Sequence, residues 1–377
     1  MSSDGTLVQT GGEAEGPPAK RPAVTPKELV SVIMPVHNAA KYLREAVACV
    51  TAQTHRPLEL VCFDDCSLDD SLTVLEEERA ALEAAGVSFV LRRSTHPAAK
   101  GPGYGRNQAV ASSSGVYLCH LDADDLMAPT RVEKQYALAV LRGENCLVGT
   151  NFDRLPAGST PYYTNWLNEM TDNDLKLQQF RECTIICPSW FMHRSVFDNV
   201  MKKAGREGGA FVESQPGLSR VPEDTFFFMD HLEHGGRLAK VSEELVTYRY
   251  TPGSWALGTP QRDLNTVRKE YLERMVLLQP QWTNFTVWGY GRDGKKFVNS
   301  LSPDVAKRVA GFCDLDPKKV GSTYFINSCR KHVPVIHFSD AKPPMVICVA
   351  SKRAQGELEV NIKTLNMEEG VDYFHFS

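Results

Sequence analysis

Three carboxylates stand close together after an apolar run in the stretch YLCHLDADDLMAP, residues 117–129. They are Asp122, Asp124 and Asp125. Like charges this near repel one another unless one is protonated or a cation lies between them. Carboxylate oxygens with open positions suit Mg²⁺ or Mn²⁺, which proteins hold with one or two acids and substrate phosphates. The alternative is an acidic helix start, which accounts for Asp124 or Asp125 but not for the third acid.

Two further polar clusters follow apolar runs upstream. The residues PVHN (35–38) end the run LVSVIMPV, and Asp64 and Asp65 end the run LELVCFDD. Short β-branched runs of this kind are typical of buried parallel strands. Because the carboxyl ends of parallel strands form the ligand crevice of an open sheet, the three clusters are expected to meet at one edge. The sequence therefore predicts a site for a cation and a diphosphate there.

Strand and helix signals alternate through the first part of the chain. We expect strands at LVSVIMPV, LELVCFDD, VSFVLRR and VYLCHL, each followed by a helix, one of which opens in the glycine-rich stretch KGPGYGRNQAVASSSG. This alternation predicts an α/β fold with a Rossmann-like, mostly parallel sheet. The pattern loosens over 150–222, where 202–220 is predicted to be a loop. It returns with a helix at VPEDTFFFMDHLEHGG and a strand at LVTYRY.

A second α/β pattern begins at FTVWGYGRDGKKFVNSL, which places a domain boundary near residue 280. The chain is then expected to consist of a disordered tail at 1–28, a catalytic domain at 29–280 and a smaller Rossmann-like α/β domain at 281–377.

The glycines of GYGRDG in this smaller domain match a dinucleotide fingerprint. A structural or partner-binding role is favoured, because a glycine turn between strand and helix also serves packing alone and Asp314 comes late for a ribose contact. The basic residues of the same domain suit a phosphate backbone or an ordinary solvated surface. They are Arg292, Lys295, Lys296, Lys307, Arg308, Lys318, Lys319, Arg330 and Lys331.

The bulk composition indicates a cytoplasmic protein. The ten cysteines stand mostly in apolar strand-like runs, which is typical of reduced thiols, and their spacing does not predict a zinc site. We find no signal-peptide pattern and no apolar segment long enough to span a membrane, so no membrane partner is expected. A net charge of −4 is too small to indicate a partner, and the oligomeric state is not predicted.

The stretches VSVIMPVHN, VCFDDCSLDDS, GYGRNQAVASSSGVYLCHLDADDLMAP and VPEDTFFFMDHL…YRY resemble family 2 glycosyltransferases of the GT-A fold, over residues 30 to about 255. The ending MEEGVDYFHFS and the appended α/β domain resemble galactosyltransferases that act on queuosine in tRNA. The resemblance implies Asp224 as catalytic base and a metal held by Asp124 with help from Asp125. From the residues alone, Glu223 and Asp224 fit an acidic helix start after Pro222 equally well.

The resemblance also implies a set of contacts to a UDP-sugar. Its members are Pro35, Val36, His37, Asp64, Asp65, Arg106, Asn107, Asp122, Ala123, Asp124 and Arg249. Asp65 would contact the uracil edge and Asp122 the ribose. The sequence departs from the family at Thr251, where a histidine that helps to hold the metal or diphosphate is common. Arg249 or Ser254 would then serve the phosphates.

These expectations give one leading hypothesis and two alternatives. The leading one is an inverting, Mn²⁺- or Mg²⁺-dependent transfer of galactose from UDP-galactose to the cyclopentene-diol of queuosine at the wobble position of a tRNA, with tRNA-Tyr implied by the resemblance. Trp166, Trp190 and Phe191 would stack on RNA bases or pack in the core. The alternatives are a UDP-N-acetylglucosamine-dependent β-1,3-transferase acting on a glycan or small acceptor, and an inactive sugar-nucleotide or tRNA-binding module.

Overall fold

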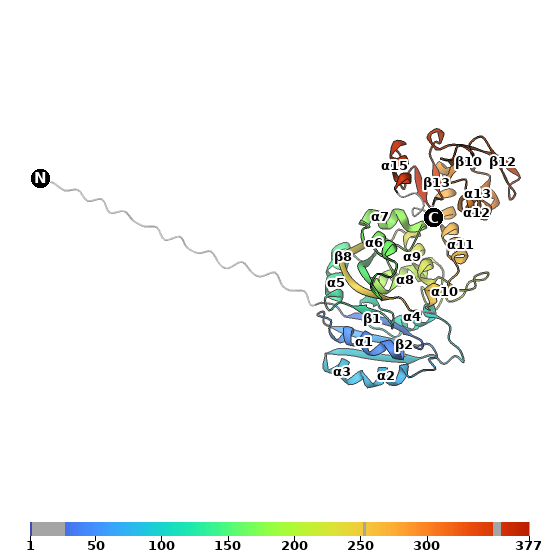
Figure 1. The fold of residues 1–377 in the computed structure, drawn as a ribbon. Coiled ribbons are helices and arrows are strands. Elements are labelled where there is room, and N and C mark those ends of the chain that lie inside the picture. The colour runs from blue at the N-terminus through green and yellow to red at the C-terminus, as the bar shows by residue number, and fades with distance from the viewer. Residues whose placement is uncertain (2–26, 252–253, 350–355, 377) are drawn as a thin grey trace.

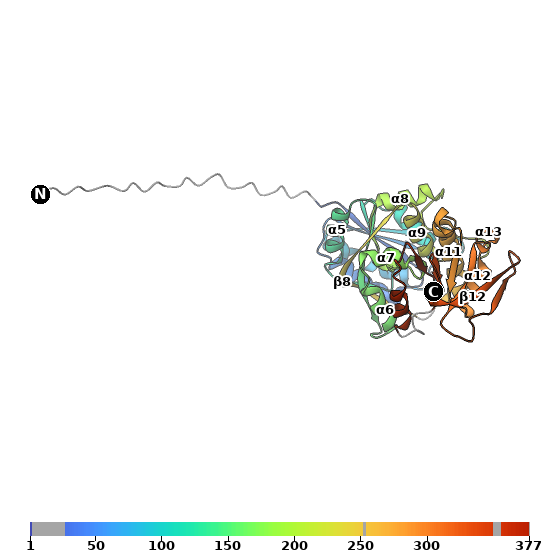
Figure 2. The same ribbon diagram turned by 90° about the horizontal axis from the view of Figure 1, so that it is seen from above.

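The computed structural model describes Met1 and residues 27–251, 254–349 and 356–376. The tail predicted at 1–28 lies almost wholly outside these residues. Within them the strands form two sheets, one of eight strands and one of six. Figure 1 shows the second sheet at the opposite end of the molecule from α2 and α3, with α7, α9 and α11 between. In the view from above in Figure 2, the second sheet with α12 and β12 lies to the right, away from α5 and β8 on the left.

The first sheet has the strand order β3-β2-β1-β4-β7-β6-β8-β5. Its strands are β1 (Val30–Val36), β2 (Leu58–Asp64), β3 (Val87–Arg93), β4 (Tyr117–His120), β5 (Leu126–Met127), β6 (Cys146–Leu155), β7 (Phe191–His193) and β8 (Arg237–Arg249). The four predicted strands β1 to β4 pair in parallel, and β1 and β2 are almost completely buried. The predicted α/β class with a mostly parallel sheet is confirmed.

The second half of this sheet is mixed rather than parallel. β7 runs antiparallel to both β4 and β6, and β5 runs antiparallel to β8. β6 and β8 are parallel, with a register shift around Asn151. The irregular pattern predicted for 150–222 hid the last part of β6 and the whole of β7, because three- to ten-residue strands without clear alternation give no distinctive period.

The helices of this part cover the sheet and carry several site residues. They are α1 (Ala40–Thr51), α2 (Ser71–Glu77), α3 (Arg79–Ala84), α4 (Pro102–Ala111), α5 (Arg131–Arg142), α6 (Pro161–Asn168), α7 (Asp172–Leu177), α8 (Arg194–Lys203), α9 (Glu223–Glu233), α10 (Trp255–Gly258) and α11 (Gln261–Leu272). Short helical turns are η1 (Gln178–Phe180), η2 (Cys187–Ser189), η3 (Glu273–Leu277) and η4 (Pro280–Trp282). Residues 204–222 contain no helix or strand, as predicted for that loop.

The helix α4 lies unusually close to β1 because glycines face the contact. A Cβ on Gly105 would come within 2.9 Å of Pro35 Cβ, and one on Gly103 would come within 2.9 Å of the Val212 carbonyl. Pro102 stands in the first turn of α4, where its missing N–H costs nothing. The glycine-rich stretch is therefore mostly helix, and it seats that helix against the end of β1.

The second sheet has the strand order β11-β12-β10-β9-β13-β14. Its strands are β9 (Phe285–Trp288), β10 (Val309–Asp314), β11 (Thr323–Ile326), β12 (Lys331–His337), β13 (Met345–Ile347) and β14 (Tyr373–His375). Its helices are α12 (Arg292–Ser300), α13 (Pro303–Ala306), α15 (Glu357–Thr364) and the turn η5 (Phe338–Asp340). All neighbouring strands are parallel except the β11–β12 hairpin, which sequence reasoning missed along with β14.

The two sheets share one continuous apolar cluster. Phe180 of η1 and Phe374 of β14 meet edge to face at 5.5 Å between ring centroids, and Trp282 lies 5.9 Å from Phe374. The side chain of Gln178 also donates to Glu369 at 2.6 Å. We keep the division near residue 280 as a proposal, since the chain changes sheet there while the packing continues.

Candidate active site

The predicted polar clusters meet at the carboxyl edge of the first sheet. β1 lies between β2 and β4 and is parallel to both, with Val36 in register with Asp64. The exposed ring of His37 reaches across so that its Nδ1 lies 2.7 Å from the main-chain oxygen of Asp65. Residues far apart in the sequence thus follow neighbouring strands at one edge of the sheet, as the strand pattern predicts.

Asp65 shapes the loop that leads into α4. Its Oδ2 accepts hydrogen bonds from the main-chain N–H groups of Lys100 and Gly101, at 2.8 and 2.7 Å. Its Oδ1 is buried and has no partner among the described residues. Asp64 is fully buried and also carries an Oδ1 for which no partner is described. A buried acceptor without a partner is costly, so Asp65 is suited to receive an N–H group from a ligand.

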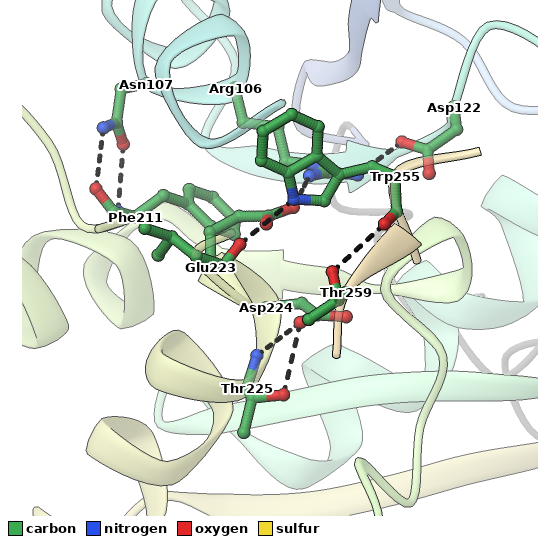
Figure 3. Close-up of polar contacts among 10 residues, drawn as sticks. Arg106, Asn107, Asp122, Phe211, Glu223, Asp224, Thr225, Trp255 and Thr259 are labelled. Atoms are coloured by element: carbon green, nitrogen blue, oxygen red, sulfur yellow. Dashed lines mark hydrogen bonds and ion pairs between the residues drawn. The ribbon is translucent and has the colours of Figure 1, made fainter. Parts of the chain in front are cut away.

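Arg106 joins two acids that come from different elements. From α4 its buried guanidinium donates to Asp122 Oδ1 at 2.6 Å and to Glu223 Oε1 at 2.5 Å (Figure 3). Burial raises the pKa of Glu223 to about 7, with the charge of Arg106 opposing and that of Asp224 adding to the shift. Arg106 therefore compensates the negative charge of the crevice rather than lying free at its surface.

Asn107 makes its contacts away from the crevice. Its side-chain amide donates to the Phe211 carbonyl at 2.9 Å and to Glu213 at 3.0 Å, and its oxygen accepts from Phe211 N–H at 3.0 Å (Figure 3). Phe211 is buried and stacks on Phe227 with ring centroids 4.8 Å apart. Asn107 thus fixes the loop before α9. The contact with the UDP-sugar that the resemblance implies for Asn107 stays a prediction.

The three acids after β4 separate into different environments. Asp122 and Asp124 remain partly exposed, while Asp125 is fully buried and accepts from the Arg249 N–H at 2.7 Å. Burial raises the pKa of Asp125 well above its usual range, and the charges of Asp124 and Asp122 add to this. Burial also raises the pKa of Asp124. Asp125 is not a helix cap, because α5 begins only at Arg131.

Thr251 occupies the place where the family resemblance implies a histidine. Its hydroxyl donates to Asp124 Oδ2 at 2.6 Å, which favours the charged form of that carboxylate. Arg249 is held beside it, with Nε donating to the Asp124 carbonyl at 2.7 Å and the guanidinium 3.0 Å from Glu45. The Arg249 side chain is therefore already paired, and Ser254 accepts from Leu257 N–H at 3.4 Å. Their proposed phosphate contacts stay predictions.

The carboxylate ligands available here fit a divalent cation only in part. Partly exposed carboxylates at Asp122 and Asp124 are hard oxygen ligands of the kind that Mg²⁺ and Mn²⁺ prefer. No group of three or more His, Cys, Asp or Glu side chains in the described part of the chain is arranged to hold a metal. Phosphate oxygens would have to complete the shell. The burial of Asp125 makes Asp122 the better partner for Asp124.

Asp224 stands at the start of α9, beside the pair formed by Arg106 and Glu223. It is partly exposed, and its Oδ1 accepts from the N–H and hydroxyl of Thr225 at 2.6 and 3.3 Å (Figure 3). The hydrogen bonds fix the orientation of the carboxylate. A partly exposed, oriented carboxylate at a crevice has the placement that a general base requires.

Sequence reasoning missed Trp255 and Arg154. The indole N–H of Trp255 donates to the Val221 carbonyl at 3.1 Å, and its ring packs on Gly101, where a Cβ would come within 3.2 Å (Figure 3). Arg154 extends from the unpredicted part of β6 over the ring of Tyr248, 4.2 Å from its centroid. For Trp255 the available signal was an aromatic residue shortly after a Pro-Gly pair in the sequence, whereas Arg154 offered no signal.

The aromatic residues weighed for RNA stacking are mostly in the core. Trp190 and Phe191 are fully buried, so neither can stack on a base. Trp166 is partly buried under the guanidinium of Arg181, 4.9 Å from its ring. All ten cysteines carry free thiols. No helix within the described ranges is both long and apolar enough to cross a membrane.

Comparison with known proteins shows which family this part of the chain resembles. Residues 31–201 match the family described as Glycosyl transferase family 2. A relative from Haemophilus influenzae, named only as an uncharacterized glycosyltransferase, is 32% identical over 107 residues, which are 28% of this chain and 40% of that protein. Chondroitin synthase of Escherichia coli is 36% identical over 105 residues, 28% of this chain and 14% of that protein. The chain thus spans less than half of either relative.

A solved structure shows the fold. Residues 1–349 of S. aureus TarS in complex with UDP superpose with a TM-score of 0.50 at 17% identity, over 75% of this chain and 83% of that one. Residues 31–201 are thus similar to family 2 glycosyltransferases, and the fold is consistent with the GT-A type.

Proposed function

We propose that the protein is an inverting glycosyltransferase that takes a sugar from a nucleoside diphosphate sugar. The observation that carries this proposal is that Asp65 and Asp124 follow β2 and β4, on either side of β1, while Arg106 joins Asp122 to Glu223, the neighbour of Asp224. The family match of residues 31–201 supports the same reaction class.

The donor would lie across the carboxyl ends of β1, β2 and β4. Pro35, Val36 and His37 would line the uridine pocket, and the unpartnered Oδ1 of Asp65 would accept the uracil N–H. Asp122 would face the ribose while Asp124 faces the diphosphate. Asp122 and Asp124 would hold Mn²⁺ or Mg²⁺ there, and the metal would supply positive charge against the leaving diphosphate.

Asp224 would act as the base on the acceptor side. An acceptor hydroxyl attacks the anomeric carbon as the bond from that carbon to the diphosphate oxygen breaks, and Asp224 takes the hydroxyl proton. The hydrogen bonds from Thr225 keep one oxygen of Asp224 in place during this step. Attack from the face opposite the leaving group inverts the configuration at the carbon.

For the particular substrates we propose UDP-galactose as donor and queuosine in tRNA, with tRNA-Tyr as the expected carrier, in the cytoplasm. What supports this choice is the resemblance of the ending MEEGVDYFHFS and of the second α/β unit to queuosine galactosyltransferases. The cyclopentene-diol offers the hydroxyl that the reaction requires.

The basic residues of the second unit support tRNA binding less than the sequence suggested, because several are used inside the protein. Arg308 donates to the Leu277 carbonyl at 2.8 Å, Lys331 to the Val309 carbonyl at 2.9 Å, and Lys319 pairs with Asp314 at 3.0 Å. Lys318 and Lys296 remain exposed. These exposed lysines are the members of the group best placed to meet a phosphate backbone.

The test is incubation of the full chain with Mn²⁺, one UDP-sugar at a time and queuosine-containing tRNA, followed by mass spectrometry of the nucleosides. Addition of one hexose to queuosine with UDP-galactose is the expected result, and tRNA with guanosine at the wobble position is the matched acceptor control. Release of UDP measured in parallel reports donor use independently of the acceptor. Transfer from UDP-N-acetylglucosamine to a glycan instead would keep the reaction class and replace the substrates. No donor turnover with any acceptor would favour the inactive binding module.

A further inference from the structure

A cavity of about 190 Å³ opens at the carboxyl edge of the second sheet. Its wall is formed where β9, β10 and β13 end, and these strands are parallel neighbours with β9 in the middle. From β9 the chain passes through α12 to β10 on one side and later returns to β13 on the other. The cavity thus lies where the strand order reverses, which is the position of ligand crevices in open parallel sheets.

The glycines of GYGRDG bring the start of α12 against this cavity. A Cβ on Gly294 would lie 2.0 Å from the Gly289 carbonyl, and Gly289 has a φ of +113°. Gly291 precedes the first residue of α12, Arg292, and both line the cavity. The first N–H groups of a helix have no partner within the helix and favour an anion. The Arg292 side chain is largely exposed, so its positive charge is available at the same mouth.

An ion pair between Asp314 and Lys319 also lines the cavity. Asp314, the last residue of β10, accepts from Tyr290 N–H at 2.8 Å and pairs with Lys319 at 3.0 Å. The sequence position of Asp314 seemed late for a ligand contact, but the fold brings it beside the glycine turn. Asp293 also lines the cavity, 3.4 Å from Arg292 Nε. Lys319 is partly exposed and can exchange its contact with Asp314 for one with a ligand.

The rest of the wall is apolar and includes an unsatisfied donor. Leu315 and Val349 contribute partly exposed apolar side chains, and the buried Trp288 lies behind them in the wall. Trp288 is fully buried and stacks on Phe338 at 5.3 Å, yet its indole N–H has no partner in the described structure. A buried N–H of this kind is uncommon in folded proteins. Together with the cavity, it is an observation independent of the helix terminus.

We propose that this cavity binds a small phosphate monoester carried on a sugar or nucleoside. The phosphate lies at the start of α12 beside Arg292, and the body of the ligand packs on the apolar wall, with its hydroxyls toward Asp314 and Lys319. The cavity volume of about 190 Å³ is below the usual range for ligand pockets, about 300–1,000 Å³. This favours a small ligand over a dinucleotide. This site lies on a different sheet from the proposed donor site and does not depend on the proposed reaction.

Gly291 allows a specific test. Its φ is not in the left-handed region and a Cβ there would meet no atom within 4 Å, so a side chain would project without a clash. Isothermal titration calorimetry of the full chain with AMP, UMP, ribose 5-phosphate and inorganic phosphate should show binding by at least one of these probes. Gly291→Val should weaken that binding at least tenfold, and Arg292→Ala should weaken it several-fold. Lys342→Ala, which removes an exposed positive charge ahead of β13 and outside the cavity wall, should leave it unchanged.

The four probes show which part of the ligand is recognised. One further variant separates binding in this cavity from binding at the proposed donor site. Equal binding by AMP, UMP and ribose 5-phosphate would show that the cavity recognises the sugar phosphate alone. Tighter binding of AMP or UMP would show that it also recognises the base. Asp65→Asn alters the proposed donor site and should not change this binding. Binding that is lost in Asp65→Asn and kept in Gly291→Val belongs to the donor site and overturns the proposal. Failure of all four probes to bind also overturns it.

Discussion

At the residue scale, the site is a balance of charges in which each acid has a different partner. Arg106 compensates Asp122 and Glu223, and Thr251 donates to Asp124. The sequence predicted which acids would gather, because strand ends can be recognised from apolar runs. It could not predict the partners, because Arg106 meets Glu223 only through the packing of α4 on α9, 117 positions apart.

Replacing Asp224 tests the proposed base. Asp224→Asn keeps the size of the side chain and can still accept from Thr225, so the fold should be retained. Loss of the base should lower kcat/KM for sugar transfer about 10²- to 10⁴-fold. The measurement is UDP release with saturating acceptor, with exposed Asp198→Asn on α8 as the control. Wild-type activity in Asp224→Asn would show that Asp224 is not the base and only provides an acidic residue at the start of α9.

The Thr251 hydroxyl is expected to tune the metal affinity of Asp124. Thr251→Val removes the donor at 2.6 Å from a carboxylate whose pKa is already raised by burial, so the charged form becomes less stable. Loss of such a supporting contact typically costs 10- to 100-fold in metal affinity. We therefore expect the Mn²⁺ concentration for half-maximal activity to rise by about tenfold or more. Thr266→Val, whose hydroxyl lies within α11, is the matched control, and an unchanged Mn²⁺ dependence would contradict the assignment.

At the element scale, α4 and α9 act together to close the site. Gly103 approaches Glu223 so closely that a Cβ would come within 3.1 Å of the Glu223 Cβ. The same helix carries Arg106, so the glycines position the guanidinium between the two acids. The helices and parallel strands of this region were predicted because their periods are clear. β7 and β5 were not, because strands of three and two residues are too short to give a period. The β11–β12 hairpin was not, because most of its residues are exposed or half-buried and form no continuous apolar run.

The contact between α4 and α9 should make stability depend on pH. The pKa of Glu223 is about 7 in the folded protein against an ordinary value of 4.5, mainly because of burial. Between these values the unfolded chain releases a proton that the folded protein keeps, so the free energy of unfolding falls as pH rises from about 4.5 to about 7. Below this window both states are protonated, and above it both are charged.

Glu223→Gln should remove this part of the pH dependence. We expect the wild-type free energy of unfolding to fall by about 1–3 kcal/mol more than that of the variant between pH 5 and pH 8. Urea unfolding at four pH values measures the difference, and exposed Glu207→Gln should follow the wild type. Parallel curves for wild type and Glu223→Gln would show that Glu223 titrates normally in the folded state.

At the scale of the whole molecule, the two sheets are joined by packing as well as by the chain. The shared cluster includes Phe180 from the first part and Trp282 and Phe285 from the start of the second. The sequence indicated the second α/β unit and its start but not this continuity, because no periodic pattern reports which faces of two units meet. The continuous packing across the junction makes independent unfolding of the two units unfavourable.

A cavity at this junction should therefore destabilise the molecule as a whole. Phe180 is fully buried between η1 and β14, where it meets Phe374. Phe180→Ala should lower the free energy of unfolding by about 3–5 kcal/mol, the usual cost of such a deletion. Because the apolar cluster is continuous, calorimetry should show one transition moved to lower temperature, whereas Phe325→Ala on the exposed side of β11 should have little effect. If Phe180→Ala instead splits the transition in two, the sheets unfold separately and the junction is an interface between independent domains.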